Sequence, residues 1–245
     1  QNIRKNPNEN YFIATDIDCY DTIYWNNGSG FLSIGDNKNP FSGKIYGNGY
    51  NIYGLNGGAL FNVTNGTINS IFLRDVNIFA RGALANINYG KIISSSSGGK
   101  IIEKLNVISL PKTSIINCFD FPVGSSFNFN LGVGGLVGIN YGNITNSYSF
   151  GKVNGSLQVG GIAGSLIKGN IINSYSNAEV FGINNVGGIA GLTLSSKIEN
   201  SYSSSKISGN NSIGGLVGVA VSKSLINNSF YSGEILAINN SGGLV

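Results

Sequence analysis

The chain has 245 residues, of which 37 are Gly and 4 are Pro, and it contains no His and no Met. Only 11% of its residues are charged, against roughly 25% in ordinary globular domains, so the composition disfavours a conventional helical domain. The net charge is +4 with scattered basic residues, which does not indicate a nucleic-acid interface, and the lack of His excludes His-containing zinc sites and His-dependent catalytic triads.

Residues 1–56 are predicted to form an N-terminal cap and the first coils of a stacked β structure. Asp16 and Asp18 share one face of a predicted strand, and together with Asp36 they could hold Ca²⁺ through oxygen ligands. The alternative is an exposed strand face and a turn, since the ordered acidic loop of a calcium site is absent. Cys19 is expected on the core-facing side.

Residues 57–102 contain degenerate copies of a repeat that becomes regular later in the chain. The segment 82–92 parallels 135–144, and 58–61 with 68–71 supply a still earlier coil. Residues 103–130 are predicted to be an insertion and an irregular coil. Cys118 lies there and is expected to point outward, so that Cys19 and Cys118 are two free thiols.

Residues 131–245 hold the regular repeats, each with a Gly-Gly pair between apolar residues. The first glycines stand at positions 134, 160, 187, 214 and 242, which gives spacings of 26, 27, 27 and 28 residues. A period of this length is typical of a solenoid in which each unit forms one coil. After each pair comes an Ile-x-Asn-Ser-aromatic segment, and period-two alternation there predicts a β-strand with Ile144, Asn146 and Tyr148 facing inward.

Stacking of coils converts equivalent positions into columns along the solenoid. An inward Asn ladder, an aromatic ladder and a column of alternating charge are expected, and the Ser positions between them are expected to form an outward hydroxyl array. The Asn ladder is Asn146, Asn173, Asn200 and Asn228; the aromatic ladder is Tyr148, Tyr175, Tyr202 and Phe230. The charged column is Lys152, Glu179, Lys206 and Glu234; the hydroxyl array is Ser147, Ser149, Ser174, Ser176, Ser201 and Ser203.

The VGGLVG segment at 133–138, followed by Ile144–Val153, closely resembles the GLUG repeat of bacterial surface proteins. The stretch from Tyr11 to Ile52 resembles what commonly precedes such repeats, so that the resemblance covers roughly residues 11 to 245. It implies a right-handed parallel β-helix of about 27-residue coils, which is an all-β fold. It also implies an extracellular surface adhesin, haemagglutinin-like protein or non-catalytic part of an IgA-cleaving peptidase, with no catalytic residues.

The sequence therefore favours a non-catalytic, secreted or cell-surface adhesin, or a structural stalk, that attaches to host cells, matrix, glycans or proteins. No cofactor or metal motif is found, and no apolar run is long enough to span a membrane as a helix. The alternative is a carbohydrate-active or glycan-binding β-helix, favoured if Asp75, Glu103 and Asp120 converge in one groove. A further alternative is an ice-binding surface on the hydroxyl array.

Two consequences follow from these assignments. Asn173→Leu is expected to destabilise the protein by about 1–3 kcal/mol, because it would remove amides from an inward ladder. Ser174→Ala is expected to cost less than about 0.5 kcal/mol, because Ser174 is assigned outward. The last residues begin a coil and leave strand edges open, so we expect either chain continuation in a longer surface protein or head-to-tail association.

Overall fold

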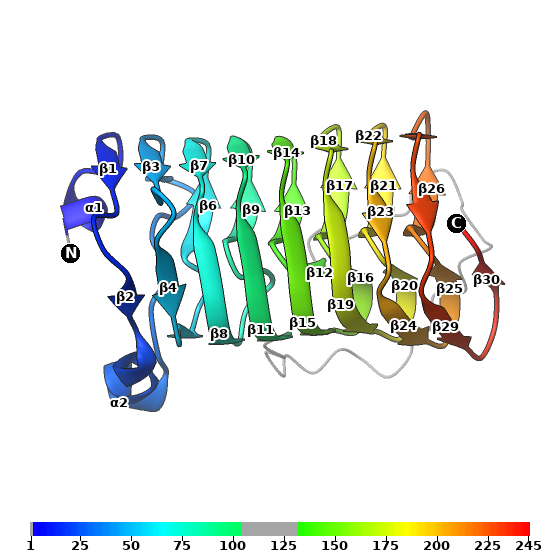
Figure 1. The fold of residues 1–245 in the computed structure, drawn as a ribbon, viewed down its shortest axis with the longest axis horizontal. Coiled ribbons are helices and arrows are strands. Elements are labelled where there is room, and N and C mark those ends of the chain that lie inside the picture. Colours follow the sequence, from blue (N-terminus) through cyan, green and yellow to red (C-terminus); the bar gives the residue numbers. More distant parts are fainter. Residues whose placement is uncertain (1, 104–131) are drawn as a thin grey trace.

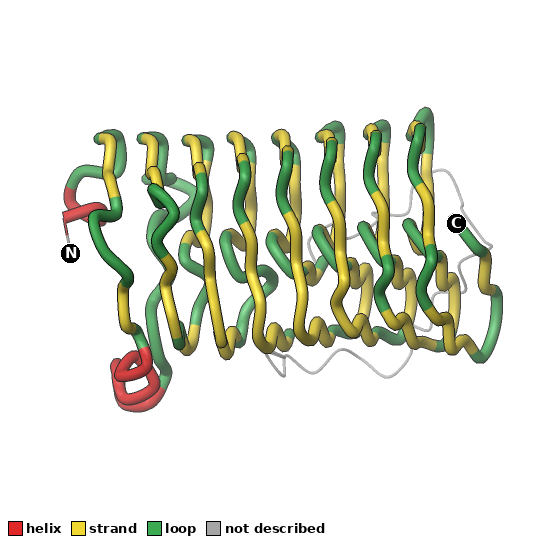
Figure 2. Tube along the Cα trace, in the orientation of Figure 1, coloured by secondary structure: helices red, strands yellow, loops and turns green. Residues whose placement is uncertain are grey.

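A computed structural model describes residues 2–103 and 132–245 of the chain. Short parallel β-strands stack coil upon coil along the long axis of the molecule, with the N-terminus at one end and the last coil at the other (Figure 1). Loops and tight corners join the strands, and within these two ranges helix is confined to short N-terminal turns (Figure 2). The structure confirms the predicted all-β solenoid.

The strands form four sheets, named A to D here, and within each sheet the neighbouring strands come from successive coils. Sheet A is β1 (Asn10–Phe12), β3 (Lys44–Tyr46), β7 (Thr67–Asn69), β10 (Lys91–Ile93), β14 (Asn143–Thr145), β18 (Asn170–Ile172), β22 (Lys197–Glu199) and β27 (Leu225–Asn227). Sheet B is β2 (Ile17–Asp18), β4 (Asn51–Tyr53), β8 (Phe72–Ile78), β11 (Ser96–Ile102), β15 (Tyr148–Asn154), β19 (Tyr175–Phe181), β23 (Tyr202–Ser203) and β28 (Phe230–Tyr231), with β5 (Asn56–Gly57), β24 (Lys206–Gly209) and β29 (Glu234–Ala237).

The other two sheets complete the circumference of the coil. Sheet C is β6 (Phe61–Thr64), β9 (Ala85–Asn88), β13 (Val137–Asn140), β17 (Ala163–Ile167), β21 (Ala190–Leu194) and β26 (Val217–Val221). Sheet D is β12 (Val133–Gly134), β16 (Leu157–Gly160), β20 (Asn184–Gly187), β25 (Asn211–Gly214) and β30 (Ser241–Gly242). The helices are α1 (Asn2–Lys5), the 3₁₀ turn η1 (Tyr20–Tyr24) and α2 (Trp25–Gly28). In the described residues, no helix is long and apolar enough to cross a membrane.

The register of sheet A accounts for the sequence period. Ile144 pairs with Ile171, Ile171 with Ile198, and Ile198 with Ile226, so one repeat advances the chain by one coil. The first three of these side chains are buried and Ile226 is half-buried, as expected for an inward aliphatic column. Burying each isoleucine is worth roughly 1.5–3 kcal/mol, which makes this column a main source of stability.

The coil that contains Ile92 stacks directly on the coil that contains Ile144. Strand β10 pairs with β14, β11 with β15, and β9 with β13, so in three sheets no further strand lies between them. The predicted irregular coil and Cys118 fall in residues 104–131, outside the described residues. Cys19 is a half-buried free thiol, and burial, with the neighbouring Asp18 charge, raises its pKa.

The predicted inward and outward assignment after the isoleucine column is wrong, because the strand alternation stops at a corner. Asn146, Asn173, Asn200 and Asn228 have φ between 49° and 50°, in the left-handed region that Asn tolerates better than most residues. The corner changes which residues face the interior, so these four Asn side chains are exposed. The Ser on either side of the next aromatic residue face the core instead.

Candidate functional site

The first Ser of each repeat closes the corner from inside. Ser174 Oγ accepts a hydrogen bond from the backbone N–H of Ser147 at 3.2 Å and donates to the Ile172 carbonyl at 2.9 Å. Ser201 repeats both bonds in the next coil, to the Ser174 N–H at 3.2 Å and to the Glu199 carbonyl at 2.8 Å. The ladder therefore satisfies backbone groups that the corner would otherwise leave buried without partners.

The second Ser of each repeat packs against the second glycine of the Gly-Gly pair. Ser149 Oγ donates to the Gly161 carbonyl and lies 3.1 Å from Ser176 Oγ, which in turn lies 3.0 Å from Ser205 Oγ. A Cβ atom at Gly161 would overlap the Gly188 carbonyl oxygen and the Ser176 side chain. Gly-Gly and Ser are therefore two halves of one packing arrangement inside the coil.

These contacts overturn the predicted hydroxyl array. The six serines share an exposure of at most 1% and lie inside the solenoid; they are Ser147, Ser149, Ser174, Ser176, Ser201 and Ser203. A buried hydroxyl cannot contact ice or a glycan, so the ice-binding surface inferred from these residues is wrong.

The aromatic residues of the repeat form a continuous stack on the outside of sheet B. Ring centroids of Tyr148 and Tyr175, and of Tyr175 and Tyr202, are 5.0 Å apart with planes 3° from parallel, and Phe230 follows Tyr202 at 5.2 Å. Since the ring faces contact one another, the ladder presents ring edges and phenol hydroxyls to the outside. The stacked rings therefore stabilise the register between coils, and their faces are not open for stacking on a ligand.

Arg74 extends this outer face toward the N-terminal coils. Its guanidinium lies 5.4 Å from the ring centroids of both Phe72 and Phe150. It donates to Ser96 Oγ at 2.8 Å and to the Tyr148 hydroxyl at 3.3 Å. Arg74 therefore serves as a structural link, because it contacts Phe72, Ser96 and Tyr148 of three successive coils.

The charged column pairs across neighbouring coils of sheet B. Lys152 Nζ lies 2.9 Å from Glu179 Oε2, and Lys206 Nζ lies 3.1 Å from Glu234 Oε2. All four side chains are more than half exposed, so each pair contributes at most about 1 kcal/mol. The main effect of the column is to set the register between neighbouring coils, and its contribution to the stability of the fold is small.

The acidic residues considered for metal binding or catalysis have separate protein partners. Asp16 accepts the Asn51 N–H at 2.8 Å, Asp18 accepts the Tyr20 N–H at 2.9 Å, and Asp36 accepts the N–H groups of Lys38 and Asn39, both at 2.8 Å. These two backbone bonds lower the pKa of Asp36. Over residues 2–103 and 132–245, no three His, Cys, Asp or Glu side chains lie close enough together to hold a metal ion.

The carboxylates named for the enzyme alternative are likewise engaged separately. Asp75 accepts the Tyr20 hydroxyl at 3.2 Å, whereas Glu103 accepts the N–H and hydroxyl of Ser156, both at 2.7 Å. Asp120 lies outside the described residues. The structure thus gives local structural roles to Asp75, in β8, and to Glu103, directly after β11.

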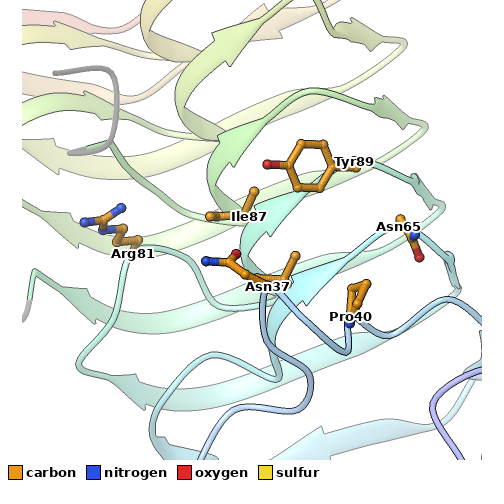
Figure 3. Close-up of a pocket in the computed structure, with 7 residues that line it drawn as sticks. Asn37, Pro40, Asn65, Arg81, Ile87 and Tyr89 are labelled. Atoms are coloured by element: carbon orange, nitrogen blue, oxygen red, sulfur yellow. The ribbon is translucent and has the colours of Figure 1, made fainter. Parts of the chain in front are cut away.

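A groove crosses the outer surface of the N-terminal coils, where sequence reasoning assigned no site. Two adjoining pockets, of about 750 and 410 Å³, share Asn65 and Tyr89. Arg81 lies at one end of the first pocket, and Pro40 and Asn65 lie at the other end of the view in Figure 3. The second pocket includes Lys44 and Lys91, and neither set of lining residues contains Asp or Glu. We call this surface the Tyr89 groove.

Comparisons with known proteins agree with the repeat and with the fold. The model of the GLUG motif matches residues 129–154. The chain is 27% identical over 162 residues to halomucin from Haloquadratum walsbyi (strain DSM 16790 / HBSQ001). That alignment covers 64% of this chain and 1% of halomucin, so the chain spans only a very small part of this relative.

Two solved structures share the architecture of the chain. The crystal structure of a putative immunoglobulin A1 protease from Bacteroides ovatus superimposes with a TM-score of 0.72 at 20% identity, covering 94% of this chain and 71% of that one. A structure named IgA1 Protease gives a TM-score of 0.71 at 20% identity, covering 99% of this chain and 20% of the other. At this identity the likeness concerns the fold alone. The chain therefore carries a GLUG motif at residues 129–154 on a β-solenoid fold, and it is similar in part to halomucin.

Proposed function

We propose that this chain is an extracellular, non-catalytic solenoid module that acts in attachment, as an adhesin segment or a stalk. The observation that carries the proposal is the unbroken stack: sheet A runs through eight strands, from β1 to β27, with a buried aliphatic column beneath it. Such a body is stiff and elongated, and each added coil extends its outer surface without altering the core.

The internal contacts of the repeat support this proposal. The recurring Ser, Gly and Ile side chains are used for packing and for backbone hydrogen bonds, as described above for Ser174 and Gly161. The outer surface varies among the regular repeats: the sheet A strands begin with Asn143, Asn170, Lys197 and Leu225 in four successive coils, and an attachment module binds its partner on such a surface. The small share of halomucin that the chain matches is consistent with one module of a longer protein.

An adhesion assay tests this function. Beads coated with the 245-residue chain are expected to adhere to cultured epithelial cells or to immobilised matrix and mucus glycans more than beads coated with serum albumin. Equal adhesion of both kinds of bead to all these surfaces would refute the attachment role. Incubation of the purified chain with polysaccharides and with immunoglobulin A1 is expected to leave them intact, and reproducible cleavage would refute the non-catalytic part.

A further inference from the structure

The Tyr89 groove has an aromatic ring with one covered and one open face. Tyr89 stacks on Tyr141 of the next coil, with ring centroids 4.8 Å apart and planes 11° from parallel. The register Thr64↔Asn88↔Asn140 makes Asn65, Tyr89 and Tyr141 equivalent positions in three successive coils. The smaller Asn65 leaves space where the column would otherwise continue with a ring, and Tyr89 is 50% exposed.

Lys44, Lys91 and Arg81 flank that open face. Lys44 and Lys91 pair with the same strand, β7, from opposite sides, so they stand two strand spacings apart, about 10 Å. Both side chains are exposed, and neither forms an ion pair within the described part of the chain. Arg81, at the far end, is half-buried; burial lowers its pKa, the nearby Glu103 charge acts in the opposite direction, and its guanidinium stays charged at neutral pH.

The rest of the groove offers neutral hydrogen-bonding groups and a small apolar surface. Asn37, Asn65 and Asn143 contribute amides, and Val63 and Ile87 contribute apolar contacts. An open aromatic face, nearby amides and spaced cations suit a pyranose chain with carboxylates, since sugar rings have an apolar face, many hydroxyls and, in uronic acids, a regular negative charge. A two-coil separation of cations is comparable to the length of a disaccharide unit.

We propose that the Tyr89 groove binds an acidic polysaccharide of the polyuronate class, with one sugar ring on the open face of Tyr89 and carboxylates near Lys44 and Lys91. The ligand lies along the solenoid axis, across the corner between sheets C and A. This proposal rests on the attachment function given above and names the chemistry of its partner. It favours a glycan over a single-stranded nucleic acid, because Tyr89 supplies one open ring and not a row of stacking platforms.

Binding is measured with fluorescein-labelled oligogalacturonate and the intact 245-residue chain. We expect saturable binding that weakens as salt rises and is not competed by neutral dextran. Asn65→Tyr is the most informative variant, because it places at this position the residue that the next two coils already have, and so covers the open face without removing Tyr89. It should weaken binding by about tenfold or more, as should Tyr89→Ala.

The charge requirement is tested with matched pairs of variants. Lys44→Ala/Lys91→Ala should weaken binding and flatten its salt dependence. Lys100→Ala/Lys152→Ala removes the same net charge from sheet B and should change affinity by no more than about twofold. Circular dichroism confirms folding of each variant, and Asn65→Tyr keeps the test decisive if Tyr89→Ala fails to fold.

Four results would overturn the proposal: no binding of oligogalacturonate at low salt, undiminished binding by folded Asn65→Tyr, competition by dextran, or equally tight, Tyr89-dependent binding of polyglutamate or oligo-dT. The bead assay distinguishes this failure from failure of the attachment function. Coated beads that adhere while oligogalacturonate does not bind would refute the groove assignment alone, and the opposite result would refute attachment alone.

Discussion

The N-terminal coils and the regular repeats fill the same solenoid in different ways. In the repeats, small hydroxyl residues such as Ser174 and Ser176 occupy the interior beside the Gly-Gly pairs. In the earlier coils, the register places Leu73 where Ser97 stands in the next coil, and a pair of stacked rings, Phe41 and Phe61, lies 4.6 Å apart in the core. The change from aliphatic to hydroxyl interior occurs between β8 and β11.

The same backbone path is thus stabilised by two kinds of interior, one aliphatic and aromatic and the other built from hydroxyl side chains and glycine. Ile71 stabilises the coil through its buried apolar side chain. Its backbone N–H donates a hydrogen bond to Ser95 Oγ of the following coil at 3.1 Å. From Ser95 onward the hydroxyl ladder repeats unchanged, which leaves little room for variation. The coils before β11 are less constrained, and the Tyr89 groove lies across the boundary, with Lys44 and Asn65 from those coils and Tyr89 and Tyr141 from coils that carry the ladder.

Among single substitutions that distinguish the two kinds of interior, the largest loss of stability is expected at the Gly-Gly pair. Gly161→Ala should destabilise the protein by roughly 2–3 kcal/mol, because the added methyl overlaps the Gly188 carbonyl and Ser176. Gly243→Ala is the matched control: it is also a second glycine, but a Cβ there meets nothing within 4 Å, so its cost should stay below about 0.5 kcal/mol. Urea unfolding midpoints compare the two, and equal midpoints would contradict the packing role.

A slightly smaller effect is expected from the hydroxyl ladder. Ser174→Ala should cost about 1–3 kcal/mol, because it leaves the buried Ser147 N–H without its acceptor. Asn173→Gly, one residue away, should stay within about 0.5 kcal/mol, since Gly adopts the positive φ of this corner freely. This order reverses the one expected from strand alternation. A harmless Ser174→Ala would restore the outward assignment of the serines.

Tyr231 offers a pH-dependent test at the position where the Ser column ends. Burial, together with the Glu234 charge, raises the pKa of Tyr231 to about 12, and its hydroxyl donates to the Ser205 carbonyl at 3.0 Å. Because the folded state holds the proton more tightly than the unfolded chain, whose Tyr pKa is about 10, this contribution is complete below pH 10 and is lost as pH rises toward 12.

The melting temperature of the native chain should therefore decrease as the pH is raised from 10 to 12. The melting temperature of the Tyr231→Phe variant should decrease less over this range. Tyr24→Phe, which removes an exposed phenol, is the control and should follow the native curve. Identical slopes for Tyr231→Phe and the native chain would show that Tyr231 does not take part.

The smallest effect is expected at the charged column on sheet B. Glu179→Gln removes the 2.9 Å contact with Lys152 and should lower stability by less than about 0.5 kcal/mol, since both side chains are exposed. Adding 0.5 M NaCl should reduce even that difference, because salt screens exposed pairs. A loss above 1 kcal/mol would mean that the column supports the fold directly and does more than set register.

Much of the fold could be predicted from the sequence, because a repeat of about 27 residues fixes the number of coils and the column of isoleucines. The inward orientation of Ser147 and Ser149 could not be predicted in this way. Period-two alternation assumes an unbroken strand, and Asn146 interrupts the strand with a positive φ. The sequence does contain a signal for the corner: Asn recurs at the joint between two short strands, and Asn is favoured at such corners.

The candidate site could be predicted only in part. The similarity of 82–92 to 135–144 already aligns Tyr89 with Tyr141, but the open face of the ring depends on Asn65 one coil earlier, in a degenerate copy. The clustering of Lys44 and Lys91 arises from the register of sheet A, which scattered basic residues in the sequence do not reveal.

In this proposal the later repeats form a scaffold, and the coils around Tyr89 bind the partner. A titration of the ¹⁵N-labelled chain with oligogalacturonate, followed by two-dimensional NMR, tests it most directly. We expect the largest amide shifts at residues 42–44, 65–67 and 89–91, with the sheet B strands β15, β19 and β23 unaffected. Shifts concentrated on β15, β19 and β23, with the groove amides unmoved, would contradict it.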